Sequence, residues 1–581
     1  MRLSASGTIR HPVRRPPSLG ERVVATRAAM KGAMGRATAA VSLSPLFRWR
    51  YGPSAADSLV IQPHDLRSAD PIFAAELLRG EIGLAGQATA FTVDRLFTER
   101  PDCAAWWTEL HGFGWLRHVT AAEDAEASQL AVAIIDQWIR RVFGHRDHIA
   151  WEPGVAARRT LAWLAHAGLL YEDAEPEAYD RFAHALGAHI VHLAATWATG
   201  RDGTDRLLAA IARVAADVCV MGREPHLSQS LGDLARELDR QIDVDGAHVS
   251  RNPDAPVEVL LDLLPVQHCV RARDIELPPG IDAAIGRMMK MIRHLRMEPD
   301  GLGRFHGGGR IGLEHVACVL GYDPQPEEIY ASGPRGGYIR LERGPVTLLI
   351  DAAGPPPLSF AGRAHAGCLA FELAMDDVLV IANAGSPFAD DAGAQTWARS
   401  TASHSTLVLA DRSSASLLAA SALERVAGGP PLVMSGRVTW ALSSTTAAEV
   451  IEAGHEGYLD AFSLVHTRRI ELRGDGTQVH GVDRLHGLNE ATVRMKKDLP
   501  FAVRFHLGAE VVAVATTQID TVDLHLPDGT VWGFSVTGVH LALEESLRHD
   551  PVVGPMMGSQ LVLRGATFGD SAVEWRLERR A

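Results

Sequence analysis

Cysteine is scarce in this chain, and its pattern excludes the usual cysteine chemistry. The five cysteines among 581 residues are odd in number and widely scattered, with no CxxC or Cys/His ligand spacing. We therefore expect no structural disulfides and no cysteine-bound metal. The sequence predicts buried free thiols instead.

Motifs for nucleotide and nucleic-acid chemistry are also missing. The chain has no P-loop and no GxSxG elbow, and the glycines at 307–309 lack the strand and helix of a phosphate loop. The net charge of −13 argues against a nucleic-acid partner, because such proteins usually present a basic surface. A polyanionic ligand would need a local basic groove.

No apolar h-region follows the basic N-terminus, so a secretory signal is not visible and the sequence alone favours the cytoplasm. The first fifty residues carry ten Lys and Arg against one acidic residue, Glu21, and we predict a flexible basic arm over residues 1–66. Residues 182–200 contain no Asp, Glu, Lys or Arg, but they include three histidines. We expect a buried helix there and no membrane span.

Helical periodicity dominates residues 67–325. Apolar residues recur at helical spacing in three stripes: Leu130, Ile134, Trp138 and Val142; Leu207, Ile211, Val214 and Val218; and Ile281, Ile285, Met288, Ile292 and Leu295. The pattern predicts a series of helices with polar joints. A chain of this length is expected to hold at least two domains.

Short runs of Val, Ile, Leu and Thr broken by Gly, Asp and Pro fill residues 326–581. Asp475-Gly476 and Asp528-Gly529 are typical hairpin turns. Serial strands of this length favour an antiparallel β-sandwich. The Gly-rich and Pro-rich stretch 307–334 is the predicted hinge between the two halves.

The segment from Gly362 to Leu409 holds the most informative residues. If the chain is extended there, Arg363 and His365 share one face, and His404 opens a second strand. This placement joins a permanent cation to titratable bases and predicts a site for an anion.

These motifs resemble the C-terminal half of the heparinase II/III family of polysaccharide lyases. The resemblance aligns Arg363 and His365 with the family's His-x-His pair, Gly367 with an Asp, Asn383 with the Asp of the following turn, and His404 with the last His. It extends upstream to HGFGWLRH and DGAHVSRNP. The resemblance implies an incomplete α/α toroid before the sandwich, a cleft between them, and relatives that are commonly periplasmic.

The family's second His, turn Asp and last His are implied to bind zinc. In this chain those positions are His365, Asn383 and His404, and a neutral amide is a poor zinc donor. The first His of the pair is Arg363, the expected Tyr is Ala255, and the helical half has one asparagine, Asn252. The active site has therefore been either rebuilt or lost.

Elimination at a uronate needs a cation for the carboxylate, a base and an acid. A guanidinium holds a carboxylate through two hydrogen bonds, which suits Arg363. His365 or His404 would be the base, with Tyr338 as a weaker alternative. The histidines could equally be packed strand residues bonded to the backbone.

Further substrate contacts are predicted from resemblance or from position near the hinge: His248, Arg251, Asn252, Arg304, His306 and Arg399. Each has a structural alternative. Asn252 could cap the following helix with Pro253 in its first turn. Arg304, His306 and Arg310 could form a solvated loop, and Arg399 could pair with Asp390 or Asp391.

The sequence thus predicts a carbon-oxygen lyase that binds an acidic polysaccharide or oligosaccharide and cleaves it by β-elimination. One alternative is a glycan-binding protein of the same fold that has lost catalysis. The other is a glycoside hydrolase using Glu372. A hydrolase needs two acids at the bond, and Glu372 would face away from Arg363 and His365 in a regular strand.

Overall fold

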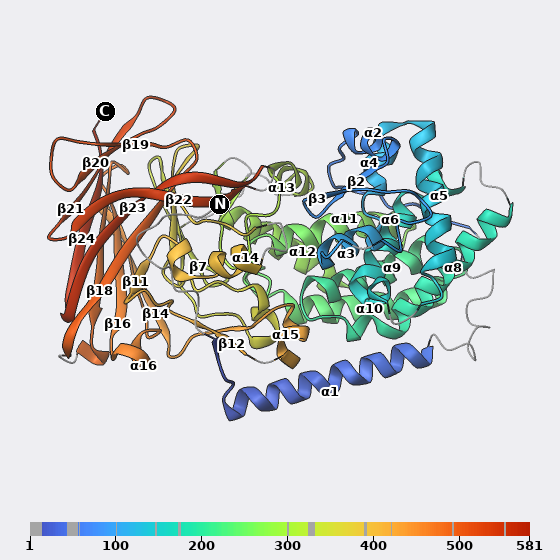
Figure 1. Cartoon of the computed structure of the whole chain (residues 1–581), viewed down its shortest axis with the longest axis horizontal. Helices are drawn as coiled ribbons and strands as arrows, with labels where there is room; N and C mark the ends of the chain where they lie inside the picture. Colours follow the sequence, from blue (N-terminus) through green and yellow to red (C-terminus); the bar gives the residue numbers. More distant parts are fainter. Residues whose placement is uncertain are drawn as a thin grey trace.

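A computed structural model describes residues 14–42, 56, 58–99, 101–145, 148–171, 176–298, 301–323, 332–387, 392–419, 421–490, 493–550 and 553–580. A helical lobe and a β-sheet lobe lie side by side along the long axis (Figure 1). The predicted order of a helical half followed by a strand-rich half is confirmed.

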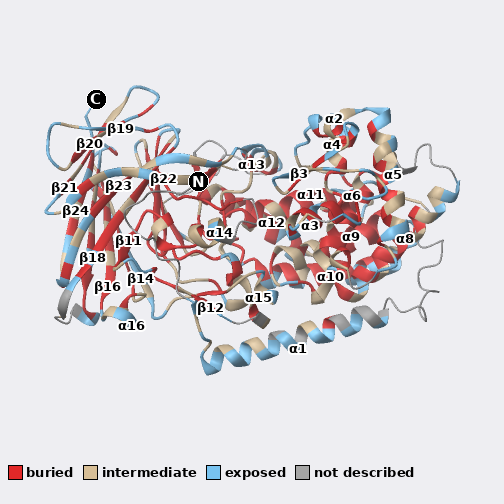
Figure 2. Cartoon of the chain, viewed as in Figure 1, coloured by how far each residue is buried: buried red, intermediate tan, exposed pale blue. Residues whose placement is uncertain are grey.

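The helical lobe packs its helices around one apolar core, which Figure 2 shows as a concentration of buried residues. Its helices are α2 (Ile72–Leu78), α3 (Ala104–Gly112), α4 (Leu116–Ala122), α5 (Ala125–Arg141), α6 (Pro153–Ala165), α7 (Ala167–Tyr171), α8 (Pro176–Thr196), α9 (Thr204–Cys219), α10 (Glu224–Gln241), α11 (Ala255–Ala272), α12 (Pro279–Leu295) and α13 (Leu313–Leu320).

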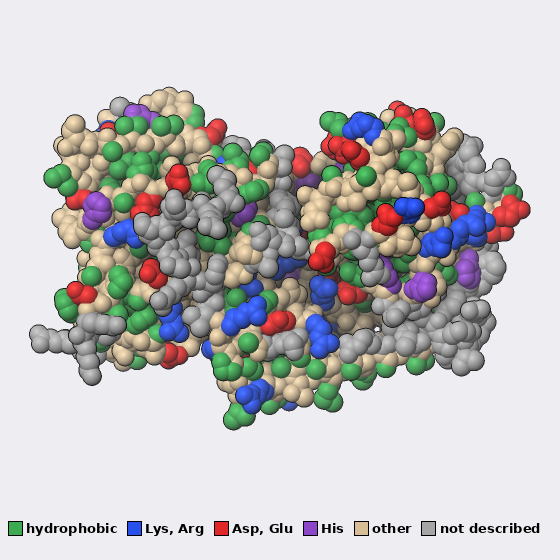
Figure 3. All heavy atoms as spheres, viewed as in Figure 1, with side chains coloured by type: hydrophobic (Ala, Val, Ile, Leu, Met, Phe, Trp, Pro, Cys, Tyr) green, Lys and Arg blue, Asp and Glu red, His purple; other side chains and the backbone are tan. Residues whose placement is uncertain are grey.

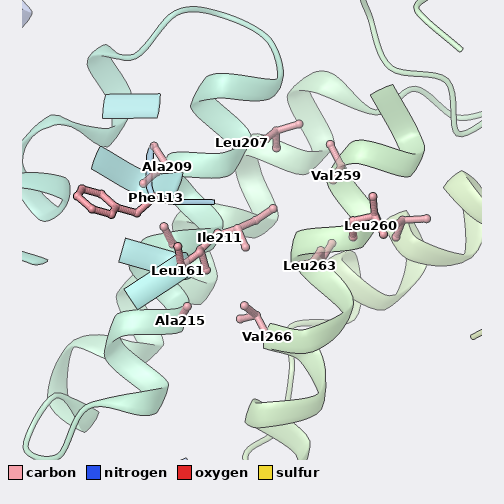
Figure 4. Packing of buried hydrophobic residues seen from close by; sticks show 14 of the residues in the cluster. Phe113, Leu161, Leu207, Ala209, Ile211, Ala215, Val259, Leu260, Leu263 and Val266 are labelled. Carbon is pink, nitrogen blue, oxygen red and sulfur yellow. The ribbon is translucent and has the colours of Figure 1, made fainter. Parts of the chain in front are cut away.

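The predicted apolar stripes form the contacts between these helices. Leu207 and Ile211 of α9 are buried against α11, and Figure 4 shows Ile211 facing Leu263 and Val266. The uncharged stretch at 182–200 forms most of α8, with Leu186 and Ile190 in the core. Among the helices of the described residues, none has the length and apolarity needed to cross a membrane.

Two antiparallel sheets form the second lobe in the described part of the chain. One has nine strands, β6 (Gly333–Arg335), β7 (Tyr338–Arg343), β8 (Val346–Asp351), β9 (Phe371–Met375), β10 (Val378–Ala382), β11 (Leu407–Leu409), β18 (Arg494–Leu507), β22 (His540–Asp550) and β23 (Gly554–Gly569). The other has eight, β14 (Val438–Ser444), β15 (Ala448–His455), β16 (Val465–Arg473), β17 (Gln478–His486), β19 (Val512–Ala515), β20 (Thr521–His525), β21 (Val531–Thr537) and β24 (Ser571–Arg579).

A shared apolar core joins these sheets into a sandwich. The rings of Phe371 on β9 and Trp575 on β24 stack at 5.8 Å between their centroids. Both predicted hairpin turns are confirmed, because Asp475-Gly476 joins β16 to β17 and Asp528-Gly529 joins β20 to β21. Gly476 and Gly529 have φ of +81° and +88°, a backbone conformation that favours glycine.

The chain around Arg363 is not an extended strand, and this part of the prediction is wrong. Residues Leu358–Arg363 form a 3-10 helix, and β9 begins only at Phe371. Alternation of side chains therefore does not apply, and Arg363 is exposed whereas His365 is buried. The two side chains do not share a face.

The described part of the N-terminal arm is folded rather than flexible, which corrects the prediction. Residues Arg14–Arg15 form β1, which pairs in parallel with β12 (Ser416–Leu418), and β12 pairs with β13 (Leu432–Val433). Helix α1 (Leu19–Ser42) then runs along the outside of the molecule (Figure 1). It packs on α15 (Ser421–Ala427) and on α8, so the arm contacts both lobes.

Hydrogen bonds between side chains and backbone groups join the two lobes. The Asp245 carboxylate accepts the backbone N–H of Gly336 at 3.0 Å, and Arg335 donates to the Asp245 carbonyl at 3.0 Å. A Cβ on Gly336 would lie 2.4 Å from the Cβ of Ala247. This close approach fixes β6 and β7 against the loop that precedes α11.

Gly481 in β17 provides a test of the sandwich core. A Cβ there would lie 2.0 Å from the Trp575 ring. We expect Gly481→Val to lower the free energy of unfolding by about 1–3 kcal/mol through overpacking. Gly558→Val in β23 is the matched control, because a Cβ there meets nothing within 4 Å. Equal denaturation midpoints for the two variants would contradict this packing.

Candidate functional site

A buried ion pair lies at the junction of the lobes. The Asp351 carboxylate, at the end of β8, accepts hydrogen bonds from Arg251 at 2.5 Å and from His306 Nε2 at 2.9 Å. Arg251 also donates to the carbonyls of Ala353 and Gly354 at 3.1 and 2.8 Å. Arg251 and His306 come from the helical half, so the pair ties that half to the sheet.

Arg251 and His306 stabilise the negative charge of Asp351. Burial acts to raise the pKa of this carboxyl, but the charge of Arg251 and the bonds from His306 outweigh it and lower the pKa to about 2. Arg251 and His306 have φ of 57° and 44°, which is a strained conformation for residues other than glycine. The ion pair and its hydrogen bonds offset that strain.

His365 and His404 form a buried chain of hydrogen bonds. His404 Nδ1 lies 2.8 Å from the Ser400 carbonyl, which can only accept, so this nitrogen carries the proton. His404 Nε2 then accepts from His365 Nδ1 at 3.1 Å, and His365 Nε2 accepts from the Ser386 hydroxyl at 3.3 Å. The geometry is that of two neutral imidazoles.

Burial keeps both rings neutral. It lowers the pKa of His404 to about 4, and burial together with the nearby His404 lowers the pKa of His365 well below its usual value. The two side chains are 1% and 4% exposed. A Cβ at position 367 would lie 2.8 Å from the His404 ring, so glycine there makes room for the imidazole.

The predicted zinc ligands are not arranged as a ligand set. The Asn383 side-chain oxygen accepts the Ser405 backbone N–H at 3.0 Å, and its amide nitrogen lies 3.3 Å from Glu372 Oε1. His365 and His404 bond to each other rather than facing a shared point. Within the described ranges, no three His, Cys, Asp or Glu side chains are grouped to hold a metal ion. These residues do not fit zinc.

Glu372, the carboxylate of the hydrolase alternative, is also buried and hydrogen-bonded to internal partners. Its Oε1 accepts the Asn383 backbone N–H at 2.9 Å, and its Oε2 accepts the Arg304 backbone N–H at 3.1 Å. The side chain is 0% exposed. It is not placed to reach a glycosidic bond.

Three other predicted site residues are buried with internal partners. Tyr338 donates to the Arg251 carbonyl, and burial raises the pKa of its hydroxyl. Burial and the charge of Arg240 lower the pKa of His248 to about 3. Arg399 donates to the carbonyls of Ala364, Ala361 and Pro430, whereas the alternative partners Asp390 and Asp391 lie outside the described residues.

The predicted cap of α11 is displaced by two residues. The helix begins at Ala255, and the Asn252 side chain accepts the backbone N–H of Asp254. Asp254 itself reaches across to the hinge, where its carboxylate accepts the backbone N–H groups of Gly309, Arg310 and Ile311 at 3.2, 2.8 and 3.2 Å. These three hydrogen bonds hold the hinge loop against α11.

Arg363 remains accessible. Its side chain is exposed, and among the described residues none forms a hydrogen bond or ion pair with it. Position 307 lies beside it, because a Cβ on Gly307 would meet Arg363 Cβ at 3.4 Å and Asn252 Nδ2 at 3.5 Å. Arg363 therefore lies near Asn252 and the start of α11.

An acidic row on α11 faces a set of arginines, which the sequence prediction missed. Asp254, Glu258 and Asp262 are spaced by four, which places them on one helix face. Asp262 pairs with Arg67 and Arg158 at 2.7 and 2.6 Å. The spacing was visible in the sequence, but the arginines come from distant segments.

Electrostatic coupling links this row to Arg363. Burial and the Asp254 carboxylate raise the pKa of Glu258, whereas the charges of Arg363 and Arg310 act to lower it. Asp262, Arg67 and Arg158 also line a pocket in the helical lobe. Figure 3 shows Lys and Arg side chains gathered at the waist between the lobes on this face.

Removing the Asp351 charge should destabilise the protein. Asp351→Asn would leave the Arg251 guanidinium buried without its counter-charge, and we expect a loss of about 3–5 kcal/mol in unfolding free energy. Asp528→Asn, at an exposed turn, is the control and should change little. An unfolding midpoint for Asp351→Asn equal to that of the control would contradict a role for the pair.

The contribution of Asp351 should depend on pH with a definite sign. Its folded pKa of about 2 lies below the usual 3.8, so its stabilisation is fully present above about pH 4. It is lost as the pH falls through about 2. Urea unfolding of wild type and Asp351→Asn should therefore converge on acidification, and a constant difference would contradict the shift.

Residues 325–576 match the family model described as heparinase II/III-like, C-terminal. The chain is also 28% identical over 537 residues to FtsZ-localized protein C of Caulobacter vibrioides, covering 90% of both chains.

Solved structures share the fold at low sequence identity. Heparinase III matches with a TM-score of 0.66 and 13% identity, over 83% of this chain and 78% of that one. A mutant of heparan sulfate lyase HepC from Pedobacter heparinus matches with a TM-score of 0.60 and 14% identity, over 98% and 92%. The toroid-plus-sandwich architecture is thus confirmed, and residues 325–576 of this chain form a heparinase II/III-like C-terminal domain.

Proposed function

We propose that this protein binds an acidic polysaccharide or oligosaccharide at the junction of its lobes and does not cleave it by β-elimination. The observation that carries the proposal is the separation of charge from base. Arg363 is an exposed cation, whereas His365 and His404 are buried, neutral and bonded to each other.

Elimination requires a base within hydrogen-bond reach of the proton that it removes. The His365 lone pair faces the Ser386 hydroxyl and the His404 lone pair faces His365, so neither is directed to a substrate. The Tyr338 hydroxyl is bonded to a backbone carbonyl. This argues for the glycan-binding alternative over the lyase.

Binding has a physical basis in the arginines at the junction. A guanidinium can hold a carboxylate through two parallel hydrogen bonds, and Arg363 has no competing ion pair among the described residues. The paired Arg67, Arg158 and Asp262 side chains would offer both donors and acceptors to sugar hydroxyls. Arg363 would thus contact the acid group, and the pocket would contact a neighbouring sugar.

A panel of uronate-containing glycans tests the proposal. We expect binding by calorimetry and no ultraviolet absorbance of an unsaturated uronate. Arg363→Gln should weaken binding about ten- to a hundredfold, because a hydrogen bond to a charged group is worth about 1.5–3 kcal/mol. Arg437→Gln, an arginine on the sandwich whose side chain is 79% exposed, is the matched control.

Other results would assign a different activity or contradict the proposal. Unsaturated product from the wild-type protein would overturn the proposal in favour of β-elimination. New reducing ends without that absorbance would indicate hydrolysis. No binding to any acidic glycan, or equal binding by the Arg363 and Arg437 variants, would also contradict the proposal.

A second candidate function follows from the full-length relative. The match to FtsZ-localized protein C covers nine-tenths of both chains, including the helical half. We infer that this chain also localises to FtsZ, a role that needs no catalysis.

Co-sedimentation with FtsZ filaments tests this second candidate. The chain should pellet with polymerised FtsZ and stay in the supernatant without it. Arg363→Gln should pellet as the wild type does if filament binding and glycan binding use different surfaces. A chain that stays in the supernatant with polymerised FtsZ would contradict the candidate.

A further inference from the structure

Helix α1 carries a narrow apolar stripe on its outward face. Leu19, Val23, Met30, Met34 and Val41 are between 52% and 82% exposed. At about 100° per residue their positions fall within an arc of about 60°. Over 24 residues the helix is about 36 Å long, so the stripe is a straight apolar ridge.

The opposite face of α1 already serves to dock the helix on the protein. Gly35 is buried, and a Cβ there would lie 2.6 Å from the Thr199 Cβ. Glu21 and Ala25 on the same side are half-buried. The inward face makes these contacts, whereas the stripe on the outward face is exposed.

Basic residues border the stripe. Arg22 and Arg27 are exposed and project to either side of it at helical spacing. The first fifty residues carry ten Lys and Arg against one acidic residue, although the whole chain has a net charge of −13. Figure 3 shows hydrophobic side chains along the edge that α1 forms, with basic side chains near the N-terminal end of the helix.

We propose that the outward face of α1 docks the protein on an anionic lipid surface, with its apolar stripe in the headgroup region and its arginines on the phosphates. A helix with a narrow apolar face and basic flanks suits the plane of a membrane interface. A second copy of the chain is a poorer fit, because two such helices would bring like charges together. The proposal is independent of glycan binding.

Vesicle flotation with the full chain tests the proposal. We expect the protein to float with vesicles of phosphatidylglycerol and phosphatidylcholine, to stay down with phosphatidylcholine alone, and to dissociate as salt rises. The double variant Met30→Gln, Met34→Gln should lose at least about tenfold in affinity. Arg22→Gln with Arg27→Gln should weaken binding to anionic vesicles.

The matched control replaces exposed apolar residues away from α1. Val244 and Ile519 are 86% and 89% exposed, and Val244→Gln with Ile519→Gln should bind vesicles as the wild type does. Circular dichroism should give all variants the same unfolding midpoint, since every altered side chain is exposed.

Several outcomes would overturn the assignment. Equal binding to neutral and anionic vesicles would show that the arginines do not contribute. Binding by the methionine variant equal to that of the wild type would show that the apolar stripe does not contribute. A dimer that the methionine variant abolishes would assign the stripe to a second copy. If the wild type binds no vesicles and the methionine variant no longer co-sediments with FtsZ, the stripe would be assigned to an acidic protein partner.

Discussion

The carboxylate of Asp351 accepts hydrogen bonds from two residues of the helical half, Arg251 and His306, and the rest of the junction is arranged around it. The Arg251 guanidinium stabilises the charge of Asp351. His306 also contacts the next segment, because its Nδ1 accepts the His365 backbone N–H at 3.2 Å. The segment that carries His365 is thereby positioned from the helical half. A buried pair of this kind is costly to break, because one charge would be left without compensation.

The departures from the family pattern are consistent with one another in this setting. Gly367 leaves room for the His404 ring, and Asn383 uses its amide to bond Glu372 and the chain before β11. The two imidazoles then bond to each other in the interior. Arg363, which the resemblance aligns with the first His of the family's pair, is exposed. The polar groups at these positions form a packed network beside an exposed cation.

Sequence alone predicted the lobes well and the site poorly, for physical reasons. Stripes such as Ile281, Ile285 and Met288 report burial directly, because helical spacing places them on one face. The predicted orientation of Arg363 was wrong because the prolines at 355–357 lead into a 3-10 helix. Side chains in a 3-10 helix do not alternate between two faces as they do in a strand. The partners of Asp262 come from residues 67 and 158, and local pattern does not reveal contacts at that separation.

We infer that His365 and His404 are structural groups that are buried away from substrate and neutral near pH 7. Deuterium exchange at the C2 position of each imidazole, followed by mass spectrometry across pH, tests it most directly. Slow exchange at both rings with no titration between about pH 5 and 8 is the predicted result, since an ordinary histidine titrates near 6.5. Fast exchange that titrates near 6.5 at either ring would contradict the account and return that histidine to the role of a base.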